Sequence, residues 1–357
     1  MDFVYDVPAS RVVFGTGRIR QVPDEVERLG SERVLLIAGG REKKYADELA
    51  AALGSRLVDR IGEVVMHVPA ALATAASERT EQSSADLVVC LGGGSAIGLA
   101  KAVVLRTGLP ILAVPTTYAG SEMTPIWGLT DGGRKITGRD RTVLPATVVY
   151  DPALTTSLPT DISAASGMNA LAHLVEGLYA PDASPVTAVL AEEGIRALAD
   201  ALPRVVVTPR DLDARTDALY GAWLAGCVLG TAGMGLHHKI CHVLGGAYDL
   251  PHAGTHSAVL PFVTAYNAPA APAAMVRAAR ALGAQDPARA LWELARRIGA
   301  PTSLAQVGLD PDRMQEAARL VVETPPANPR PVDRAAVHEL LRAAHAGIPP
   351  GLSGPGA

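Results

Sequence analysis

A dense run of histidines is the part of this sequence with the clearest potential for chemistry. Five of the nine histidines fall within twenty residues of one another: His237, His238, His242, His252 and His256. Histidine is the commonest metal ligand and the side chain most easily poised as an acid or a base near neutral pH. His238 and His242 are four residues apart and share one face of a helix. We interpret the run as an active site or a metal site. A solvated or structural role would explain a single histidine, but it explains five in so short a run less well.

A glycine-rich turn in the first half of the chain is a second candidate site. The apolar run 87–91 leads directly into Gly92, Gly93, Gly94 and Ser95, and a helical stretch follows. Glycines let backbone N–H groups approach phosphate oxygens, the helix dipole favours negative charge there, and a serine can cap the helix or bind the phosphate. Three glycines exceed what a tight turn requires, so we predict a phosphate-binding loop. It matches neither Gly-x-Gly-x-x-Gly nor the Walker motif.

Hydroxyl-bearing residues follow the next predicted strand. Ligands of an open α/β sheet bind at the carboxyl ends of its strands. The candidates there are Thr116, Thr117, Tyr118 and Ser121. Capping of the next helix explains any one of these hydroxyls equally well.

The end of the first apolar strand bears on the choice of cofactor. Nucleotide-binding α/β proteins often carry an acid there for the ribose, whereas this chain continues with Gly39, Gly40 and Arg41. We assign Gly39 to the cofactor site. An arginine does not repel a ribose 2′-phosphate, so the sequence leaves both NADH and NADPH as candidates.

The predicted secondary structure differs between the two halves of the chain. Up to residue 150, β-branched runs at 34–38, 64–68, 87–91, 111–114 and 147–150 alternate with helical stretches at 42–53, 72–84 and 96–105. This alternation predicts a parallel sheet covered on both faces. Beyond residue 155 almost every stretch has helical character. We therefore expect a Rossmann-like dinucleotide-binding α/β domain at 1–155 and an all-helical domain at 156–357 that carries the histidine run.

Composition excludes several classes of protein. With 48% hydrophobic and 19% charged residues the chain can bury a large core, and a formal net charge of −4 without a basic block argues against nucleic acid as a partner. Its three cysteines are too few for a disulfide framework and fit a reducing cytosol. No signal peptide and no apolar run of membrane-spanning length is evident. We expect a cytoplasmic protein without membrane contact.

Several segments together resemble one family. The matching segments are 92–95, 115–124, 166–173, 237–246 and 250–252. They resemble the iron-containing (group III) alcohol dehydrogenases and, within them, the maleylacetate reductases. The resemblance implies the fold shared with dehydroquinate synthase, an N-terminal dinucleotide-binding domain followed by a helical catalytic domain, and it implies a homodimer. Residues 4–14 are a candidate strand for pairing between subunits.

The resemblance also indicates a metal site and a departure from it. Metal-dependent members use an aspartate and a histidine four residues apart on one helix, with two later histidines; the matching residues here are Asn169, His173, His238 and His252. The amide of Asn169 is a weaker ligand than a carboxylate and removes a negative charge, which weakens binding of a hard divalent cation. Three histidines can still hold zinc. Zinc or iron is therefore not favoured, in keeping with the maleylacetate reductases.

The implied reaction is NADH- or NADPH-dependent reduction of maleylacetate, a 4-oxo-2-enedioate, to 3-oxoadipate during the degradation of aromatic compounds. His242 matches a family histidine near the nicotinamide, so we expect it to donate the proton. His173, His238 and His252 are expected to donate hydrogen bonds to the developing oxyanion.

The substrate's two carboxylates need cationic partners. Lys239, inside the histidine run, is the first candidate. Lys135 matches a family lysine near the cofactor and is assigned to that site. Arg139 and Arg141 are further candidates, although solvated loop charges explain these two arginines better.

Other functions remain open at this point. A metal-dependent alcohol or aldehyde dehydrogenase of the same superfamily would need another acid in place of Asn169. A biosynthetic reductase could use the same groups on another unsaturated keto acid. A lyase on the dehydroquinate-synthase version of the fold would need a firmly bound metal, and a non-catalytic scaffold would be expected to have lost the histidines.

Overall fold

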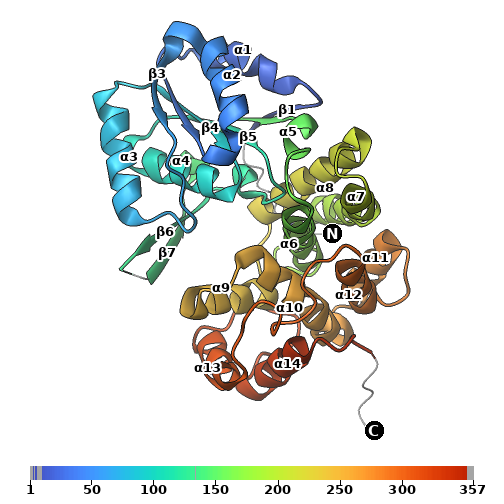
Figure 1. Ribbon diagram of the computed structural model, residues 1–357. Coiled ribbons are helices and arrows are strands. Elements are labelled where there is room, and N and C mark those ends of the chain that lie inside the picture. The colour runs from blue at the N-terminus through green and yellow to red at the C-terminus, as the bar shows by residue number, and fades with distance from the viewer. Residues whose placement is uncertain (1–2, 4, 6–9, 133, 352–357) are drawn as a thin grey trace. The chain divides into compact units, whose positions relative to one another are not determined.

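The computed structural model describes residues 3, 5, 10–132 and 134–351, and for Arg134 and Lys135 it describes the backbone alone (Figure 1). The chain divides into two compact units, one within residues 7–158 and the other mainly within residues 159–357. We call them the α/β unit and the helical unit and describe each by itself.

The α/β unit is built on a six-stranded sheet of order β1-β8-β5-β4-β2-β3, in which neighbouring strands run parallel. The strands are β1 (Arg11–Phe14), β2 (Val34–Ala38), β3 (Leu57–Ile61), β4 (Leu87–Gly92), β5 (Ile111–Pro115) and β8 (Thr147–Tyr150). Every residue of β4 is buried. This confirms the predicted parallel sheet, with the apolar run 87–91 as an interior strand.

Helices cover both faces of this sheet. They are α1 (Val22–Arg28), α2 (Lys43–Leu53), α3 (Ala70–Gln82), α4 (Gly94–Thr107) and the short α5 (Pro152–Thr155). Alternate residues of β2, such as Leu36, share one core with α1 and α2. Their neighbours, such as Leu35, face the other way and are fully buried as well, and α4 packs on β4 and β5. Burial on both faces explains why these strands read as unbroken apolar runs.

One predicted strand is wrong and three others were missed. Residues 64–68 form no strand, because His67 and Val68 have φ values of 62° and 44°, in the left-handed region. The edge strand β3 precedes this segment in the chain, and its polar residues Asp59 and Arg60 interrupt the apolar pattern by which a strand is recognised. An antiparallel pair, β6 (Ile126–Asp131) and β7 (Arg134–Arg139), also escaped prediction.

The segment predicted to pair between subunits lies partly in the chain's own sheet, and the pairing itself stays a prediction. Arg11–Phe14, the end of that segment, forms β1 and pairs with β8 of its own sheet. Residues 4 and 6–9 lie outside the described residues. An edge strand beside a buried parallel neighbour satisfies one side of its backbone within the chain.

The described residues of the helical unit form helices and no strand, as predicted. The helices are α6 (Thr160–Gly177), α7 (Pro185–Val207), α8 (Leu212–Thr231), α9 (Leu236–Tyr248), α10 (His252–Asn267), α11 (Pro272–Leu282), α12 (Pro287–Arg297), α13 (Met314–Glu323) and α14 (Arg334–Ala346). Helix α10 was not predicted. It is buried on almost all sides and contains Pro261, so it lacks an amphipathic stripe.

The helix carrying most of the histidine run is held in a well-packed core. Leu236, Ile240 and Leu244 of α9 are fully buried and share a core with α10, α13 and α14. Among the described residues, no single helix has the length and apolar character of a membrane span. Helices α8 and α9 meet those criteria only jointly, across a bend of 95°.

Candidate active site

The glycine turn between β4 and α4 requires glycine for steric reasons. Gly92 has φ 153°, and a Cβ there would lie 2.8 Å from the Cβ of Ala96. A Cβ on Gly93 would lie 2.8 Å from Cγ2 of Thr117, so the glycine turn and the loop after β5 touch each other. Gly94 and the half-buried Ser95 begin α4. This arrangement places the N-terminal N–H groups of α4 where a phosphate can bind.

The loop after β5 contains the other predicted cofactor residues. Thr116 donates its backbone N–H to the carbonyl oxygen of Gly92 at 3.1 Å. Ser121 begins the turn η4 (Ser121–Met123), whereas the ring of Tyr118 is fully buried. Of these hydroxyl-bearing side chains, that of Thr117 lies against the glycine turn, at Gly93.

A buried lysine holds this loop against α4. Nζ of Lys101, a fully buried residue of α4, donates to the carbonyl oxygens of Ser121, Thr124 and Ile126 at 2.6, 2.7 and 2.7 Å, and Oγ1 of Thr124 lies at 3.1 Å. Burial lowers the pKa of Lys101 to about 7, and the nearby carboxyl of Glu122 opposes this shift. We call Lys101 with its four oxygen partners the lysine hub.

Near the glycine turn, the surface of the α/β unit has a small open hollow. Its lining consists of Arg41, Glu42, Tyr45, Thr116, Leu154, Ser157 and Leu158. Gly39 precedes it, at the start of the turn η2 (Gly40–Glu42). Sequence reasoning considered Arg41 here and overlooked Glu42, whose Oε1 accepts a hydrogen bond from Oγ1 of Thr116 at 3.0 Å.

In the helical unit, six imidazoles contributed by α6, α9 and α10 form one contiguous cluster. The ring centroids lie 4.9 Å apart for His173 and His238, 4.9 Å for His238 and His256, 4.8 Å for His237 and His256, 4.4 Å for His252 and His256, and 6.4 Å for His242 and His252. The structure therefore brings the four predicted catalytic histidines together. It adds His237 and His256, which the sequence placed outside the ligand pattern.

A buried carboxylate anchors this histidine cluster, and sequence reasoning missed it. Oε2 of Glu176 accepts a hydrogen bond from Nδ1 of His238 at 2.6 Å. The same carboxylate accepts the backbone N–H groups of Gly235 at 3.0 Å and His237 at 2.8 Å, at the start of α9. A negative charge is favoured at a helix N-terminus. The spacing of Glu176 from His173 and Asn169, three and seven residues, puts all three on one face of α6 and was a usable indication.

These contacts fix the direction of a chain of hydrogen bonds. Because Nδ1 of His238 donates to Glu176, Nε2 of a neutral His238 accepts, and Nδ1 of His173 donates to it at 2.8 Å. Nε2 of His173 then accepts from the amide of Asn169 at 3.4 Å. Oδ1 of Asn169 is buried and has no hydrogen-bond partner among the described residues. We call this series, from Asn169 to Glu176, the donor chain.

The donor chain is a poor fit to the metal that metal-dependent proteins of this fold hold. A divalent ion needs the lone pairs of His173 and His238, and here each accepts a hydrogen bond. The position of the acidic ligand is taken by Asn169, whose amide brings no negative charge. As arranged, these residues fit a hydrogen-bonded network and do not fit a hard divalent cation.

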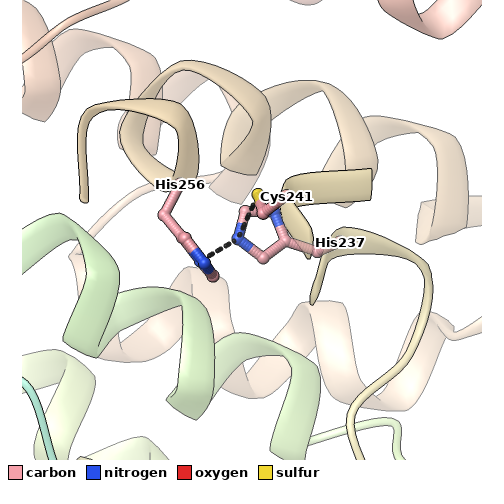
Figure 2. Close-up of side chains that lie close together, drawn as sticks. All are labelled: His237, Cys241 and His256. Carbon is pink, nitrogen blue, oxygen red and sulfur yellow. Dashed lines mark hydrogen bonds between the residues drawn. The ribbon is translucent and has the colours of Figure 1, made fainter. Parts of the chain in front are cut away.

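The innermost part of the cluster is a buried group of two imidazoles and a thiol. Figure 2 shows His237 and Cys241 of α9 facing His256 of α10, with 2.9 Å between the two histidines and 3.7 Å from Sγ to Nε2 of His237. Burial, reinforced by neighbouring histidines, lowers the pKa of both imidazoles well below the usual value. Burial raises the pKa of Cys241 well above its usual value. The group is therefore neutral at pH 7.

The outer part of the cluster is more accessible. His242 is exposed, and His252 and Lys239 are half-buried. Lys239 and His242 are three residues apart on α9 and are neighbours on its surface. Lys135 lies in β7, with its side chain outside the described residues, and Arg139 and Arg141 are exposed near the end of that strand.

Comparisons with known proteins cover both units. A model of the iron-containing alcohol dehydrogenases matches residues 9–152, and one of the C-terminal part of the Fe-containing alcohol dehydrogenase family matches residues 163–345. The chain is 54% identical over 350 residues to a maleylacetate reductase of Sphingobium indicum, covering 98% of this chain and 99% of the relative. The crystal structure of a maleylacetate reductase from Agrobacterium tumefaciens has a TM-score of 0.95 at 44% identity, covering 98% of this chain and 100% of that one. A maleylacetate reductase from Rhizobium sp. strain MTP-10005 gives a TM-score of 0.94 at 45% identity, covering 98% and 99%.

Proposed function

The chain belongs to the iron-containing alcohol dehydrogenase family, and we propose that it is an oxidoreductase that uses NADH or NADPH to reduce maleylacetate to 3-oxoadipate. The substrate assignment is supported by the similarity to a maleylacetate reductase that is 54% identical in sequence over nearly the full length of both chains. Within the molecule, the observation that carries the proposal is the donor chain, in which two of the family's imidazoles, His173 and His238, connect the amide of Asn169 to the buried carboxylate of Glu176.

The proposed reaction is a conjugate reduction. The nicotinamide delivers hydride to the alkene carbon β to the ketone, the carbon–carbon π electrons move towards the ketone, and its oxygen becomes an enolate oxygen. A proton then adds to the α carbon, which completes the saturated keto diacid. The protein has to bind two carboxylates, stabilise one oxyanion and supply one proton.

The outer histidines and Lys239 suit these tasks. His242 is exposed at the end of the cluster and is assigned as the proton donor, and Lys239 beside it is assigned to a substrate carboxylate. His252 is assigned to polarising the ketone oxygen. The N–H groups of His173 and His238 are engaged within the donor chain, so these two rings are assigned to holding the site in position. Glu176 keeps the proton of His238 on Nδ1 and so fixes its tautomer. In the α/β unit, the glycine turn and the loop held by Lys101 are assigned to the dinucleotide.

The proposal includes a reaction that proceeds without a bound divalent metal. A resident zinc or iron would be held by His173, His238 and His252 with the Asn169 amide, and it would supply a Lewis acid for the ketone oxygen. The missing acid at position 169 and the engagement of both Nε2 lone pairs within the donor chain support this part of the proposal. Elemental analysis before and after chelation tests this point. We expect less than stoichiometric zinc or iron and unchanged activity, and stoichiometric metal with activity lost on chelation would contradict it.

The substrate assignment is tested by oxidation of NADH and of NADPH with maleylacetate and with simple aldehydes. We expect a kcat/KM for maleylacetate at least about 1,000-fold above that for any aldehyde, because aldehydes lack the two carboxylates and the conjugated alkene. Faster turnover of aldehydes would favour an alcohol or aldehyde dehydrogenase.

Two finer points belong to the same proposal. A homodimer is tested by light scattering coupled to size-exclusion chromatography, where a monomeric mass would contradict it. A cytoplasmic location accords with the three cysteines, none of which forms a disulfide in the described part of the chain.

A further inference from the structure

Glu42 lies where the carboxyl ends of three neighbouring strands meet. It stands four residues after the last residue of β2, and a Cβ on Gly39 would be 3.4 Å from its Oε2. A Cβ on Gly92, at the end of β4, would lie 3.8 Å from its Cδ. Thr116, which follows β5, donates its hydroxyl to Oε1 at 3.0 Å. The carboxylate is therefore fixed in position beside the glycine turn.

This position is also where the sheet changes direction. From β2 the chain moves outward to β3 and then returns to β4 on the other side of β2. Dinucleotides bind outside the carboxyl ends of strands at such a switch point, with the pyrophosphate on the glycine turn. Glu42, Tyr45 and Leu158 line the hollow next to that turn. Its mixed apolar and polar lining suits a nucleoside.

We propose that Glu42 makes this protein select NADH over NADPH, because its fixed carboxylate accepts hydrogen bonds from the ribose of the adenosine half and repels a 2′-phosphate. The inference rests on the proposed function for the identity of the cofactor. It replaces the interpretation from sequence, in which glycines and an arginine at this strand end left room for the phosphate.

Arg41 is the group that opposes this selection. It is exposed, and within the described part of the chain it makes no hydrogen bond or ion pair. To hold a 2′-phosphate its side chain would first have to lose its rotational freedom. Glu42 is already ordered by Thr116 and partly buried, so its repulsion is less screened than the attraction of a solvated arginine. The balance therefore favours NADH.

The first measurement is kcat/KM for NADH and for NADPH with maleylacetate, in the wild type and in Glu42→Gln. We expect the wild type to prefer NADH by about 100-fold. Repulsion between the carboxylate of Glu42 and a nearby 2′-phosphate in a partly buried site should weaken NADPH binding by at least about tenfold. Glu42→Gln should reduce the ratio at least about tenfold, mainly by raising kcat/KM for NADPH. Glu42→Asp, which keeps the charge, should retain the preference. Glu48→Gln, an exposed position on α2, is the matched control.

Binding measured without substrate separates this inference from the proposed function. Titration of NADH and NADPH by nicotinamide fluorescence should give the same preference and the same change in Glu42→Gln, even if maleylacetate proved not to be the substrate. Equal affinities of the wild type for both cofactors would overturn the inference, as would an unchanged ratio in a folded Glu42→Gln. Arg41→Ala should change the ratio less than about threefold, and a larger loss of NADPH binding in that variant would assign the selection to Arg41 instead.

Discussion

The lysine hub of the α/β unit and the histidine cluster of the helical unit differ in how completely their buried polar atoms are hydrogen-bonded. Every oxygen around Nζ of Lys101 lies within 3.1 Å, so the ammonium is fully hydrogen-bonded. In the histidine cluster, Oδ1 of Asn169, Nδ1 of His237 and Nε2 of His256 are buried without a hydrogen-bond partner among the described residues. Fully paired polar networks fix a structure, whereas unpaired buried groups cost stability and concentrate at functional sites.

This difference suggests separate roles for the two regions. The lysine hub holds the loop between Thr116 and Thr124 in one conformation, which keeps the glycine turn and Thr117 in contact. The histidine cluster is anchored at one point by Glu176 and reaches the surface at His242. Changes at the hub should therefore act on stability, and changes at the exposed end of the cluster should act on catalysis.

Removing the exposed imidazole should have the largest effect and acts on catalysis alone. We expect His242→Ala to slow single-turnover oxidation of the reduced cofactor with saturating maleylacetate by about 100- to 10,000-fold, the usual contribution of a general acid. Thermal unfolding should change little, because the side chain is exposed. His338→Ala, a half-buried histidine of α14 outside the cluster, is the control. An unchanged rate in His242→Ala would remove this residue from the mechanism.

Removing the buried ammonium should act on stability. Lys101→Met keeps the length of the side chain but leaves the carbonyls of Ser121, Thr124 and Ile126 without their donor, so we expect a loss of about 3–5 kcal/mol in the free energy of unfolding. Denaturation by urea measures the loss, with the exposed Lys44→Met of α2 as control. A change below about 1 kcal/mol would show that the hub is dispensable and would weaken the contrast between the two regions.

Mild acid should weaken the histidine cluster before it affects ordinary carboxylates. Burial holds the pKa values of His237 and His256 well below 6.5, so below that pH the unfolded state binds more protons than the folded state. Each imidazole then removes stability as the pH falls, and the slope approaches about 1.4 kcal/mol per pH unit once the unfolded imidazole is fully protonated. Between pH 6.5 and 5.5 we expect a loss of about 2 kcal/mol by urea denaturation, about 1 kcal/mol for each histidine. A flat profile in this window would show that the two histidines gain protons without unfolding.

Replacing the anchor of the cluster should have the smallest of these effects, because it acts through another residue. Glu176→Gln removes the carboxylate that holds the proton of His238 on Nδ1, and we expect kcat to fall about 10- to 100-fold, as for other groups that orient a ligating or catalytic histidine. Nitrogen NMR should show a changed tautomer of His238. A lower kcat with the tautomer of His238 unchanged would make the role of Glu176 purely structural.

Much of the fold could be predicted because the relevant patterns are local. The apolar runs that became β2, β4, β5 and β8 are buried on both faces and stand out without knowledge of their neighbours. The misplaced strand at 64–68 shows the limit of this reasoning. Its residues have the right composition, but His67 and Val68 have positive φ values, just before α3 begins. Helix α10 was missed for a similar reason, because burial on nearly every side removes the periodic pattern.

Most residues of the candidate site were predicted, but the hydrogen bonds that connect them were not. The histidines, Asn169 and the glycine turn were all found from residue type and spacing. Glu42 and Glu176 were missed, since an acid in a helical or loop sequence usually faces solvent. Their roles depend on partners 74 and 62 residues away, Thr116 and His238. Only the seven-residue spacing from Asn169 to Glu176 offered an indication in advance.

The sequence by itself therefore determined which reactive groups this protein carries and which of them share a turn or one face of a helix, because those relations follow from local backbone geometry. The tertiary structure decided which lone pairs accept a hydrogen bond and which carboxylate lies beside the glycine turn. Hydrogen bonds between distant segments form only when strands and helices have packed, and their direction then fixes the tautomers of His173 and His238.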